Sequence, residues 1–389
     1  MTVEIETVAD RVLSAEPLTA DLLALDVLPV PDVPRPAPEP RLLGVATAAS
    51  ATSFTQREVL DAFAVTDPKV RSVFLNSAIE RRNLVLPAPG PDGVRASEPQ
   101  GDLLDKHRAM AVEMGGAALL DCLASIGADV SDVRHLCCVT STGFLTPGLS
   151  ALIIRAFGLD RHTSRSDIVG MGCNAGLNAL NVVAGWAAAH PGELAVVVCA
   201  EACSAAYTMD GTMRTAVVNS LFGDGAAALA VRAPAPGETG GSAGPRVLKF
   251  ASCLIPDAID AMRYDWDRDQ GRFSFYLDPH IPYVVGAHAE LVVDRLLAGT
   301  GLRRSDVRHW LVHSGGKKVI DAVVVNLGLS RHDVRHTTGV LRDHGNVSSA
   351  SFLFSYERLL REGVTAPGEY GVLMTMGPGS TIETALVQW

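Results

Sequence analysis

A short motif that occurs twice constrains the fold more than any other feature of the sequence. Residues Ser131–His135 read Ser-Asp-Val-Arg-His, and the same five residues return at Ser305–His309. A second motif, Gly158–His162, is echoed by Gly328–His332, in the same order and at a similar distance along the chain. The alternative is coincidence between charged surface turns, but two ordered matches favour a duplicated α/β unit.

The chain divides into an extension and two halves. Residues 1–41 form the predicted N-terminal extension, because the prolines between Pro29 and Pro40 favour an extended arm over a core element. Residues 42–235 and 246–389 form the two halves, which a loop rich in Gly and Pro separates. Within each half, short apolar runs alternate with longer amphipathic runs, and this alternation predicts an α/β fold.

The composition excludes several classes of function. The 389 residues carry a formal net charge of −10, whereas nucleic-acid-binding proteins need a basic face, so no nucleic acid is expected as a partner. No apolar run approaches the roughly 18 residues of a membrane span, so no membrane partner is expected. The acidic start of the chain lacks a signal peptide, which predicts a cytoplasmic protein. Scattered cysteines without a CxxC pair favour free thiols and no metal site.

One cysteine has the surroundings of a nucleophile. Cys173 lies in the glycine-rich segment Gly170–Gly176, between a β-branched run and an expected helix of small residues. The N-terminus of a helix lowers the pKa of a nearby thiol, and the glycines permit a tight turn. The alternative is a small core cysteine, and Cys137, Cys138 and Cys199 fit that alternative better because they lie inside apolar runs.

Two further residues fit a catalytic site together with Cys173. His313 ends the apolar run Trp310–Val312 and precedes a glycine pair, in the kind of position where active-site loops of α/β folds gather. Asn346 lies within residues 343–351, and taken alone it would be an ordinary helix N-cap. Beside a cysteine and a histidine, its amide is a candidate donor to a developing oxyanion. Two similar halves that face one another would bring the three residues to their interface, where ligand sites often form.

Five motifs in one order resemble the type III polyketide synthases of the thiolase superfamily. They are Gly172–Gly176, Leu221–Ala226, His313–Gly316, Gly345–Ser349 and Gly377–Gly379. The resemblance extends from about Leu42 to Trp389, and it implies an α/β protein with a thiolase-like five-layer αβαβα fold made of two duplicated halves. Biosynthetic thiolases fit less well, because the C-terminal glycine loop holds no second cysteine.

The resemblance implies an acyltransferase that uses CoA thioesters and no cofactor. Cys173 would carry the growing chain, and His313 and Asn346 would stabilise the enolate that decarboxylation creates. A bacterial subgroup that the chain resembles more closely uses malonyl-CoA as starter and extender, joins four units and closes a ring on a CoA thioester. The resemblance also implies a homodimer and accessory dehydratase- or hydratase-type enzymes of the same antibiotic pathway.

The resemblance further implies residues that contact the substrate. The expected cavity residues are Thr142, Thr146, Glu201, Tyr207, Phe222, Phe275, Gly379 and Ser380. The expected CoA contacts are Arg81, Arg82, Gly315, Gly316, Lys317 and Lys318. Solvated surface charge is the alternative interpretation of each basic residue, and Glu201 would either tune the thiolate or orient a loop. Phe275 matches one of two gatekeeping phenylalanines of the plant enzymes, whereas Tyr207 is a weak match to the other, which disfavours an aromatic starter.

Two alternatives to this function stay open at this point. One is another thiolase-superfamily condensing enzyme, either a fatty-acyl enzyme or a polyketide synthase with a different starter. The other is a catalytically inactive homologue that serves as a partner subunit, which the intact set of Cys173, His313 and Asn346 disfavours. Incubation with malonyl-CoA alone distinguishes the three possibilities.

Overall fold

The computed structural model describes residues 38–238 and 244–389. Most of the predicted N-terminal extension, with its proline-rich arm, therefore lies outside the described residues, as does part of the predicted loop between the halves. Every helix that the structure describes is too short or too polar to span a lipid bilayer.

The first half of the chain builds one twisted sheet. Its strands, in order across the sheet, are β1 (Arg41–Ala48), β7 (Gly225–Arg232), β6 (Leu194–Glu201), β4 (Val133–Val139) and β5 (Ser164–Ile168). β4 runs parallel to both of its neighbours, whereas β7 is antiparallel to β6 and β1. β4, β6 and β7 are buried along almost their whole length, because their sequences are nearly continuous apolar runs.

The second half builds a similar sheet. Its strands, in order, are β11 (Val307–Val312), β12 (Tyr370–Gly377), β13 (Thr381–Gln388) and β8 (Arg246–Leu254). β11 and β12 are parallel, and the remaining pairs are antiparallel. A single residue pair, Arg41 with Arg246, joins β1 to β8, so the two sheets form one continuous order of nine strands.

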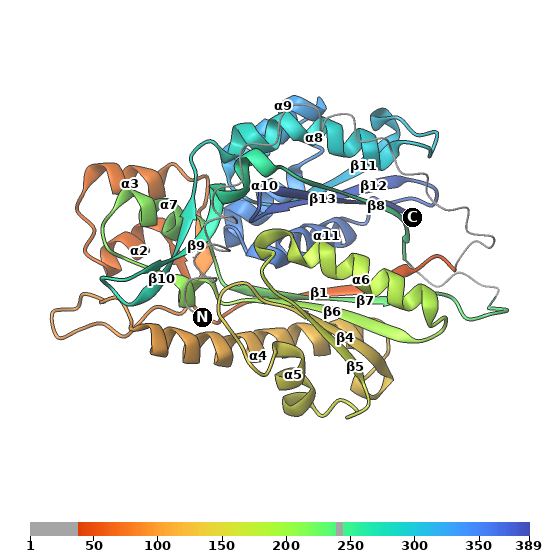
Figure 1. The fold of residues 1–389 in the computed structure, drawn as a ribbon, viewed down its shortest axis with the longest axis horizontal. Helices are drawn as coiled ribbons and strands as arrows, with labels where there is room; N and C mark the ends of the chain where they lie inside the picture. Colours follow the sequence, from red (N-terminus) through yellow and green to blue (C-terminus); the bar gives the residue numbers. More distant parts are fainter. Residues whose placement is uncertain (1–37, 239–243) are drawn as a thin grey trace, which may run out of the picture. The chain divides into compact units, whose positions relative to one another are not determined.

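Helices cover and separate the two sheets, as Figure 1 shows. From one outer face to the other they are α4 (Gln100–Ser125) with α5 (Leu149–Phe157), then α6 (Ala175–Ala189) with α11 (Ser351–Glu362), then α8 (Ile281–Leu297) with α9 (Lys317–Leu327). Three apolar cores follow these layers, one outside each sheet and one between the sheets. The order of the layers is αβαβα, which is the order that the family resemblance implies.

The repeated motifs occupy equivalent places in the two halves. Each copy of Ser-Asp-Val-Arg-His contains a 3-10 turn that leads into a strand, which is β4 in the first half and β11 in the second. Each copy of the second motif starts with a glycine that ends a helix in the left-handed conformation, Gly158 at φ 71° after α5 and Gly328 at φ 67° after α9. The predicted duplication is therefore confirmed.

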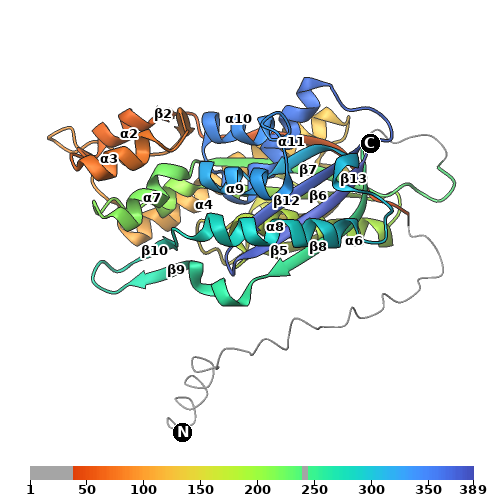
Figure 2. The same ribbon diagram turned by 90° about the horizontal axis from the view of Figure 1, so that it is seen from above.

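A smaller group of elements lies at one end of the layers (Figure 2). It comprises α2 (Gln56–Ala62), α3 (Pro68–Leu75), α7 (Met213–Leu221), β2 (Ser53–Thr55), β3 (Arg81–Asn83) and the hairpin of β9 (Met262–Asp267) and β10 (Arg272–Leu277). Leu60 and Phe74 belong to a separate small core of this group. We call α2, α3, α7, β2 and β3 the peripheral lobe. α10 (Arg335–His344) packs against α11 and β3, and so connects this lobe to the central layer.

The first turn of α6 packs very closely against η7 (Ser348–Ala350), the turn that precedes α11. A Cβ atom on Gly176 would lie 2.3 Å from the carbonyl oxygen of Ser349 and 2.8 Å from the ring of Phe352. Because no side chain fits at these distances, the glycine allows the two central helices to start side by side. Gly185, further along α6, has no neighbour within 4 Å of the equivalent position.

We expect Gly176→Ala to lower the free energy of unfolding by about 1–3 kcal/mol, because the added methyl group overpacks the contact with Ser349. Gly185→Ala is the matched control, and it should leave stability unchanged or raise it by up to about 1 kcal/mol, since alanine is the better helix former. Urea unfolding followed by circular dichroism measures both changes. Similar effects of the two substitutions would contradict the close packing at Gly176.

Candidate active site

A cavity of about 950 Å³ opens where β4, β5 and β6 end. The predicted residues that line it are Thr142, Thr146, Cys173, Tyr207, Phe222 and Phe275. The sequence analysis did not single out its other polar lining residues, among them Ser141, Tyr264 and Ser348. Ser348 follows Asn346 by two residues in the Gly-Asn-Val-Ser-Ser motif, so this motif could have identified Ser348 as a site residue. The hairpin of β9 and β10 offered no such motif.

Cys173 lies at the junction between β5 and α6. It belongs to the turn η3 (Gly172–Asn174), which leads directly into the helix, as the sequence predicts for a strand-to-helix turn. Gly172 adopts φ 60°, and a Cβ there would lie 2.5 Å from Pro378. The glycine therefore permits both the left-handed turn and the close approach of Pro378, which keeps the thiol at the edge of the cavity.

Asn346 is held by backbone contacts that cross between the two halves. Its amide N–H donates to the carbonyl oxygen of Leu221 at 2.8 Å, and its own carbonyl oxygen accepts from the N–H of Gly223 at 3.0 Å. Its side-chain Oδ1 accepts from the backbone N–H of Ser348 at 2.9 Å. Because Oδ1 is occupied in this way, the Nδ2 group is the part of the amide that is available to a substrate, and its hydrogen bond lowers the pKa of Cys173.

His313 follows β11 at the end of the second sheet. Its backbone N–H donates to the carbonyl oxygen of Met374 at 2.8 Å, and the hydroxyl of Ser314 donates to the carbonyl oxygen of Gly345 at 3.3 Å. The second contact brings His313 next to the segment that carries Asn346. In the described part of the chain, no hydrogen bond joins the imidazole to Cys173 or Asn346; such contacts often tighten only when substrate binds.

Burial opposes charge on both the thiol and the imidazole. It raises the pKa of Cys173 to about 12 and lowers the pKa of His313 to about 3. Hydrogen bonds act in the other direction on the thiol: Ser348 Oγ lies 3.5 Å from Cys173 Sγ, and this contact lowers the pKa of Cys173. Each group is therefore neutral when considered alone, and the thiolate depends on the polar groups around it.

A chain of hydroxyl groups connects Glu201 to the thiol. Ser141 donates to Glu201 through its backbone N–H and its hydroxyl, each at 2.9 Å, and its Oγ lies 3.0 Å from Ser348 Oγ. Ser349 also donates to the carboxylate. Glu201 is fully buried, and burial raises its pKa. It stands behind the cavity lining, so its contacts hold the loop after β4 and the turn η7 together.

Arg82 is not available to CoA, which corrects its prediction as a phosphate contact. Its side chain is fully buried, and it donates to the carbonyl oxygens of Asn219 and Phe222 at 2.6 Å each. It also donates to Tyr207 Oη at 2.6 Å and to Gln56 Oε1 at 2.7 Å. Strand alternation turns Arg81 outward and Arg82 inward, where the guanidinium binds the carboxyl end of α7.

The same contacts define the place of Tyr207. Its hydroxyl donates to the carbonyl oxygen of Phe222 at 2.6 Å and accepts from Arg82. The ring lines the cavity, but the hydroxyl group points into this buried network. Tyr207 therefore shapes the wall near Phe222, and its hydroxyl already has protein partners.

The other predicted CoA contacts lie outside the cavity lining. Arg81, Lys317 and Lys318 are exposed, and Lys317 forms an ion pair with Asp321 at 2.5 Å. Gly315 lies close to His313, since a Cβ there would be 3.0 Å from Cδ2 of the imidazole. Gly316, at φ 134°, precedes the first residue of α9. Gly315, Gly316, Lys317 and Lys318 therefore lie in the segment that leads from His313 into α9.

The turn after β12 contributes a different residue from those predicted. Pro378 lines the cavity, whereas Gly379 and Ser380 do not. The hydroxyl of Ser380 donates to the carbonyl oxygen of Ala258 at 2.6 Å, so it anchors the segment that leads to β9. The prediction of Gly379 and Ser380 as cavity residues is corrected accordingly.

The hairpin of β9 and β10 supplies an aromatic wall. Tyr264 and Phe275 are cross-strand partners with ring centroids 5.0 Å apart, and Phe222 meets Phe275 edge to face at 5.9 Å. Phe273, further toward the tip of the hairpin, packs beside Tyr264. Its backbone N–H donates a hydrogen bond to Gln100 Oε1 at 2.9 Å, which attaches the hairpin to α4. The wall is thus fixed to α4 on one side and to Phe222 on the other.

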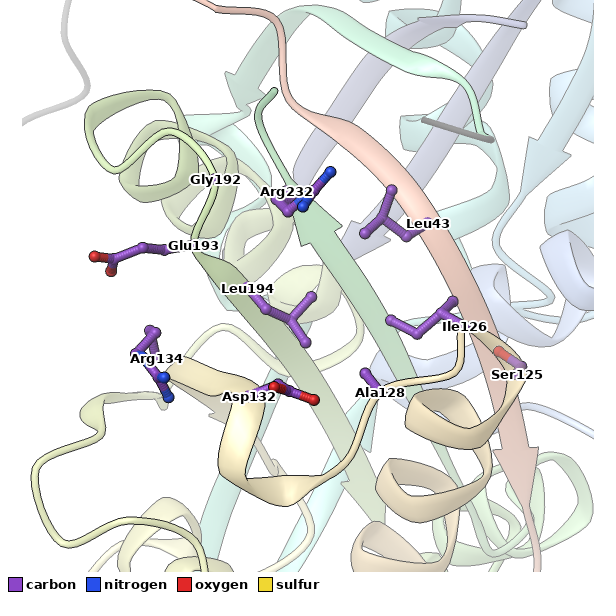
Figure 3. A pocket seen from close by; sticks show the side chains of 10 residues that line it. All are labelled: Leu43, Ser125, Ile126, Ala128, Asp132, Arg134, Gly192, Glu193, Leu194 and Arg232. Atoms are coloured by element: carbon purple, nitrogen blue, oxygen red, sulfur yellow. The ribbon is translucent and has the colours of Figure 1, made fainter. Parts of the chain in front are cut away.

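A second pocket, of about 650 Å³, lies at the opposite ends of the strands (Figure 3). Its charged residues are Asp132, Arg134, Glu193 and Arg232, so both signs of charge are mixed there. It contains none of the predicted site residues. In residues 38–238 and 244–389, no group of three or more His, Cys, Asp or Glu side chains is arranged to hold a metal ion.

Comparison with known families matches both halves of the chain. Residues 252–389 match the C-terminal domain of chalcone and stilbene synthases, and residues 49–236 match the FAE1/type III polyketide synthase-like proteins. The chain belongs to the type III polyketide synthases, which are condensing enzymes of the acyltransferase class and use CoA thioesters. The predicted family is therefore confirmed.

Individual relatives narrow this assignment. The chain is 76% identical to 3,5-dihydroxyphenylacetyl-CoA synthase of Streptomyces toyocaensis over 97% of this chain and 96% of that protein. It is 77% identical to the enzyme of the same name from Amycolatopsis balhimycina, over 90% and 93% of the two chains. Among solved structures, 1,3,6,8-tetrahydroxynaphthalene synthase of Streptomyces coelicolor superposes with a TM-score of 0.81 at 28% identity, over 90% of this chain and 99% of that chain. This likeness confirms the thiolase-like fold class.

We expect Ser348→Ala to slow the alkylation of Cys173 by iodoacetamide at neutral pH. The hydroxyl lowers the pKa of the thiol, so its removal raises that pKa and leaves less thiolate at any pH below it. The loss of one hydrogen bond of this kind corresponds to about a 3- to 10-fold slower reaction. Peptide mass spectrometry across a pH series measures the rate.

Ser355→Ala is the matched control, because Ser355 is a buried serine of α11 whose hydroxyl donates only to the backbone of Ser351. Its pH curve should coincide with that of the unaltered enzyme. A curve for Ser348→Ala that is unmoved, or displaced to lower pH, would contradict the assigned contact.

Proposed function

We propose that this chain is a 3,5-dihydroxyphenylacetyl-CoA synthase that condenses four molecules of malonyl-CoA and closes the chain to an aromatic CoA thioester. The observation that carries the proposal is its 76% identity, over nearly the full length of both chains, to an enzyme of that name. The cavity of about 950 Å³, with Cys173 in its lining, supports the same assignment. No cofactor takes part in the proposed reaction.

Cys173 is the acyl carrier in this proposal. His313 accepts the thiol proton, the sulfur attacks the malonyl thioester, and CoA leaves as its thiol once it has taken up a proton. The cavity wall also contains Cys138 and Cys203, but among residues 38–238 and 244–389 no hydroxyl contacts either thiol as Ser348 contacts Cys173. Burial raises the pKa of both thiols well above that of an exposed cysteine, which disfavours their thiolate forms.

Decarboxylation of a malonyl group creates an enolate whose oxygen carries the negative charge. Asn346 Nδ2 and the protonated imidazole of His313 donate to this oxygen in the proposed mechanism, because both side chains are buried and donors that are held in place away from solvent stabilise developing charge. The enolate carbon then attacks the acyl group on Cys173. Each cycle releases one CO₂ and extends the chain by two carbons.

The shape of the cavity supports a small starter. Phe275, Phe222 and the ring of Tyr207 narrow it, and the hydroxyl of Tyr207 is already committed to Arg82 and Phe222. Four malonyl units supply the eight carbons of the dihydroxyphenylacetyl group. Malonyl-CoA therefore serves as both starter and extender, and the exposed Arg81, Lys317 and Lys318 remain the proposed contacts to the CoA phosphates.

We further propose that the enzyme is a homodimer that acts in the cytoplasm with accessory dehydratase- or hydratase-type enzymes of its pathway. β5 is an edge strand with an unpaired side, and two apolar residues beside it, Phe144 and Val169, are 76% and 69% exposed. Exposed apolar residues next to a strand edge favour association with another chain. CoA thioesters are intracellular substrates, which supports the location.

We expect the product of fully ¹³C-labelled malonyl-CoA to carry label at all eight acyl carbons, even when unlabelled acetyl-CoA and benzoyl-CoA compete. Apolar walls discriminate between similar acyl groups by only about 10- to 200-fold, so slow use of acetyl-CoA is compatible with the proposal. Mass spectrometry of the products measures incorporation. A main product with an unlabelled acetyl or aroyl unit would identify a different condensing enzyme, and absence of turnover would identify an inactive subunit.

We expect Asn346→Ala to reduce the release of ¹⁴CO₂ from labelled malonyl-CoA by about 10²- to 10³-fold, because one donor to the enolate oxygen is lost. Acylation of Cys173 should continue, since the amide acts on the second chemical step. Asn326→Ala, which removes an exposed asparagine of α9 whose side chain donates to the carbonyl oxygen of Ala322, serves as the control for decarboxylation. Unchanged CO₂ release in Asn346→Ala would contradict the donation to the enolate oxygen and would leave Asn346 with a structural role only.

A further inference from the structure

His313 and two other buried side chains have polar atoms without a hydrogen-bond partner among the described residues. They are Nδ1 of His313, Oγ1 of Thr375, and both Oδ1 and Nδ2 of Asn174. All three side chains are at most 2% exposed. Buried polar groups nearly always bind another protein group or an ordered water molecule, so these atoms require a common explanation if they lie together.

The sheet register brings His313 and Thr375 together. β11 and β12 are parallel with Val312 opposite Met374, so the next pair along both strands is His313 and Thr375. The hydrogen bond from His313 N–H to the carbonyl oxygen of Met374 continues this ladder. Leu311 lies in the core between the sheets. Since side chains alternate along a strand, His313 and Thr375 both face the central layer.

Asn174 reaches the same corner from η3. Gly377 lies two residues beyond Thr375 and therefore on the same face of β12. A Cβ atom on Gly377 would lie only 2.5 Å from Asn174 Oδ1. Alternate residues of a strand are about 7 Å apart, and two hydrogen bonds of about 2.8 Å through one water molecule span most of that distance. A buried water typically makes about three hydrogen bonds, which equals the number of side chains that meet here.

We propose that Asn174 and Thr375 are positioning residues that, together with one buried water molecule, accept the hydrogen bond from Nδ1–H of His313 and so keep Nε2 unprotonated toward Cys173. This inference rests on the proposed function, in which His313 accepts the proton of the thiol. Neither positioning residue touches the substrate.

The chemistry requires an acceptor at this position. Burial lowers the pKa of His313 and so favours the neutral imidazole, which carries its proton on only one nitrogen. If Nδ1 faced no acceptor, the proton would reside on Nε2, and that nitrogen could not accept the proton of Cys173. The oxygens of Asn174, Thr375 and water accept the hydrogen bond without adding a charge to the buried site.

The experiment compares the rates at which iodoacetamide alkylates Cys173 in isosteric variants of the full chain. Thr375→Val removes the hydroxyl at constant shape, Thr375→Ser restores it, and Asn174→Leu removes the amide. Thr384→Val is the matched control, because Thr384 is an equally buried threonine on the neighbouring strand β13 whose hydroxyl donates to the carbonyl oxygen of Ala251.

We expect alkylation to slow by about tenfold in Thr375→Val and in Asn174→Leu, the effect of one lost hydrogen bond, with recovery in Thr375→Ser and no change in Thr384→Val. In enzyme with ¹⁵N-labelled histidine, the His313 signal, assigned through His313→Gln, should report protonated Nδ1. The same signal should report protonated Nε2 in Thr375→Val.

Unchanged alkylation in both Thr375→Val and Asn174→Leu would overturn the inference, as would equal slowing in Thr375→Ser or Thr384→Val. Protonated Nε2 in the unaltered enzyme would overturn it as well. These measurements concern only the thiol and the imidazole, so they succeed or fail independently of the product formed from malonyl-CoA, which tests the proposed function separately.

Discussion

The active site depends on the close approach of two turns, η3 and η7, that start the two central helices. Gly176 lets α6 begin against the carbonyl oxygen of Ser349, and this contact brings Cys173 of the first half to Ser348 of the second. Two similar α/β units, each with polar residues at the carboxyl ends of its strands, bring these residues together at this contact. The nucleophile and the oxyanion donor therefore come from different halves, and neither half contains a complete site.

The groups around the thiol of Cys173 are hydroxyls and amides. The buried carboxylate of Glu201 is connected to the thiol only through the hydroxyl groups of Ser141 and Ser348. Burial opposes charge on Cys173 and on His313 alike, so a separated charge must be stabilised by fixed dipoles such as those of Ser348 and Asn346. Such dipoles need no rearrangement when an enolate forms. The site thus stays nearly neutral at rest and is prepared for charge that arises during the reaction.

Sequence patterns predicted the parts of the structure that are local or repeated. The duplicated motifs gave matching turn–strand units and helix ends, and the glycines around Cys173 gave the turn. Arg81 and Arg82 could not be distinguished, because their outward and inward directions depend on a three-residue strand whose partner, β2, lies far away in the sequence. Phe275 of β10 was predicted, but its cross-strand partner Tyr264 was missed, since the alternating charged and aromatic residues of β9 are typical of an exposed strand.

Arg82 also bears on how this enzyme can acquire new substrates. Its guanidinium donates to the carbonyl oxygen of Phe222, and the neighbouring Leu221 and Gly223 hydrogen-bond to the backbone of Asn346, so hydrogen bonds connect the peripheral lobe to the oxyanion donor. Mutations that widen the cavity by shifting α7 would disturb catalysis at the same time. The aromatic hairpin is tethered elsewhere, through Gln100 of α4, so evolutionary changes in starter size are expected to accumulate there first.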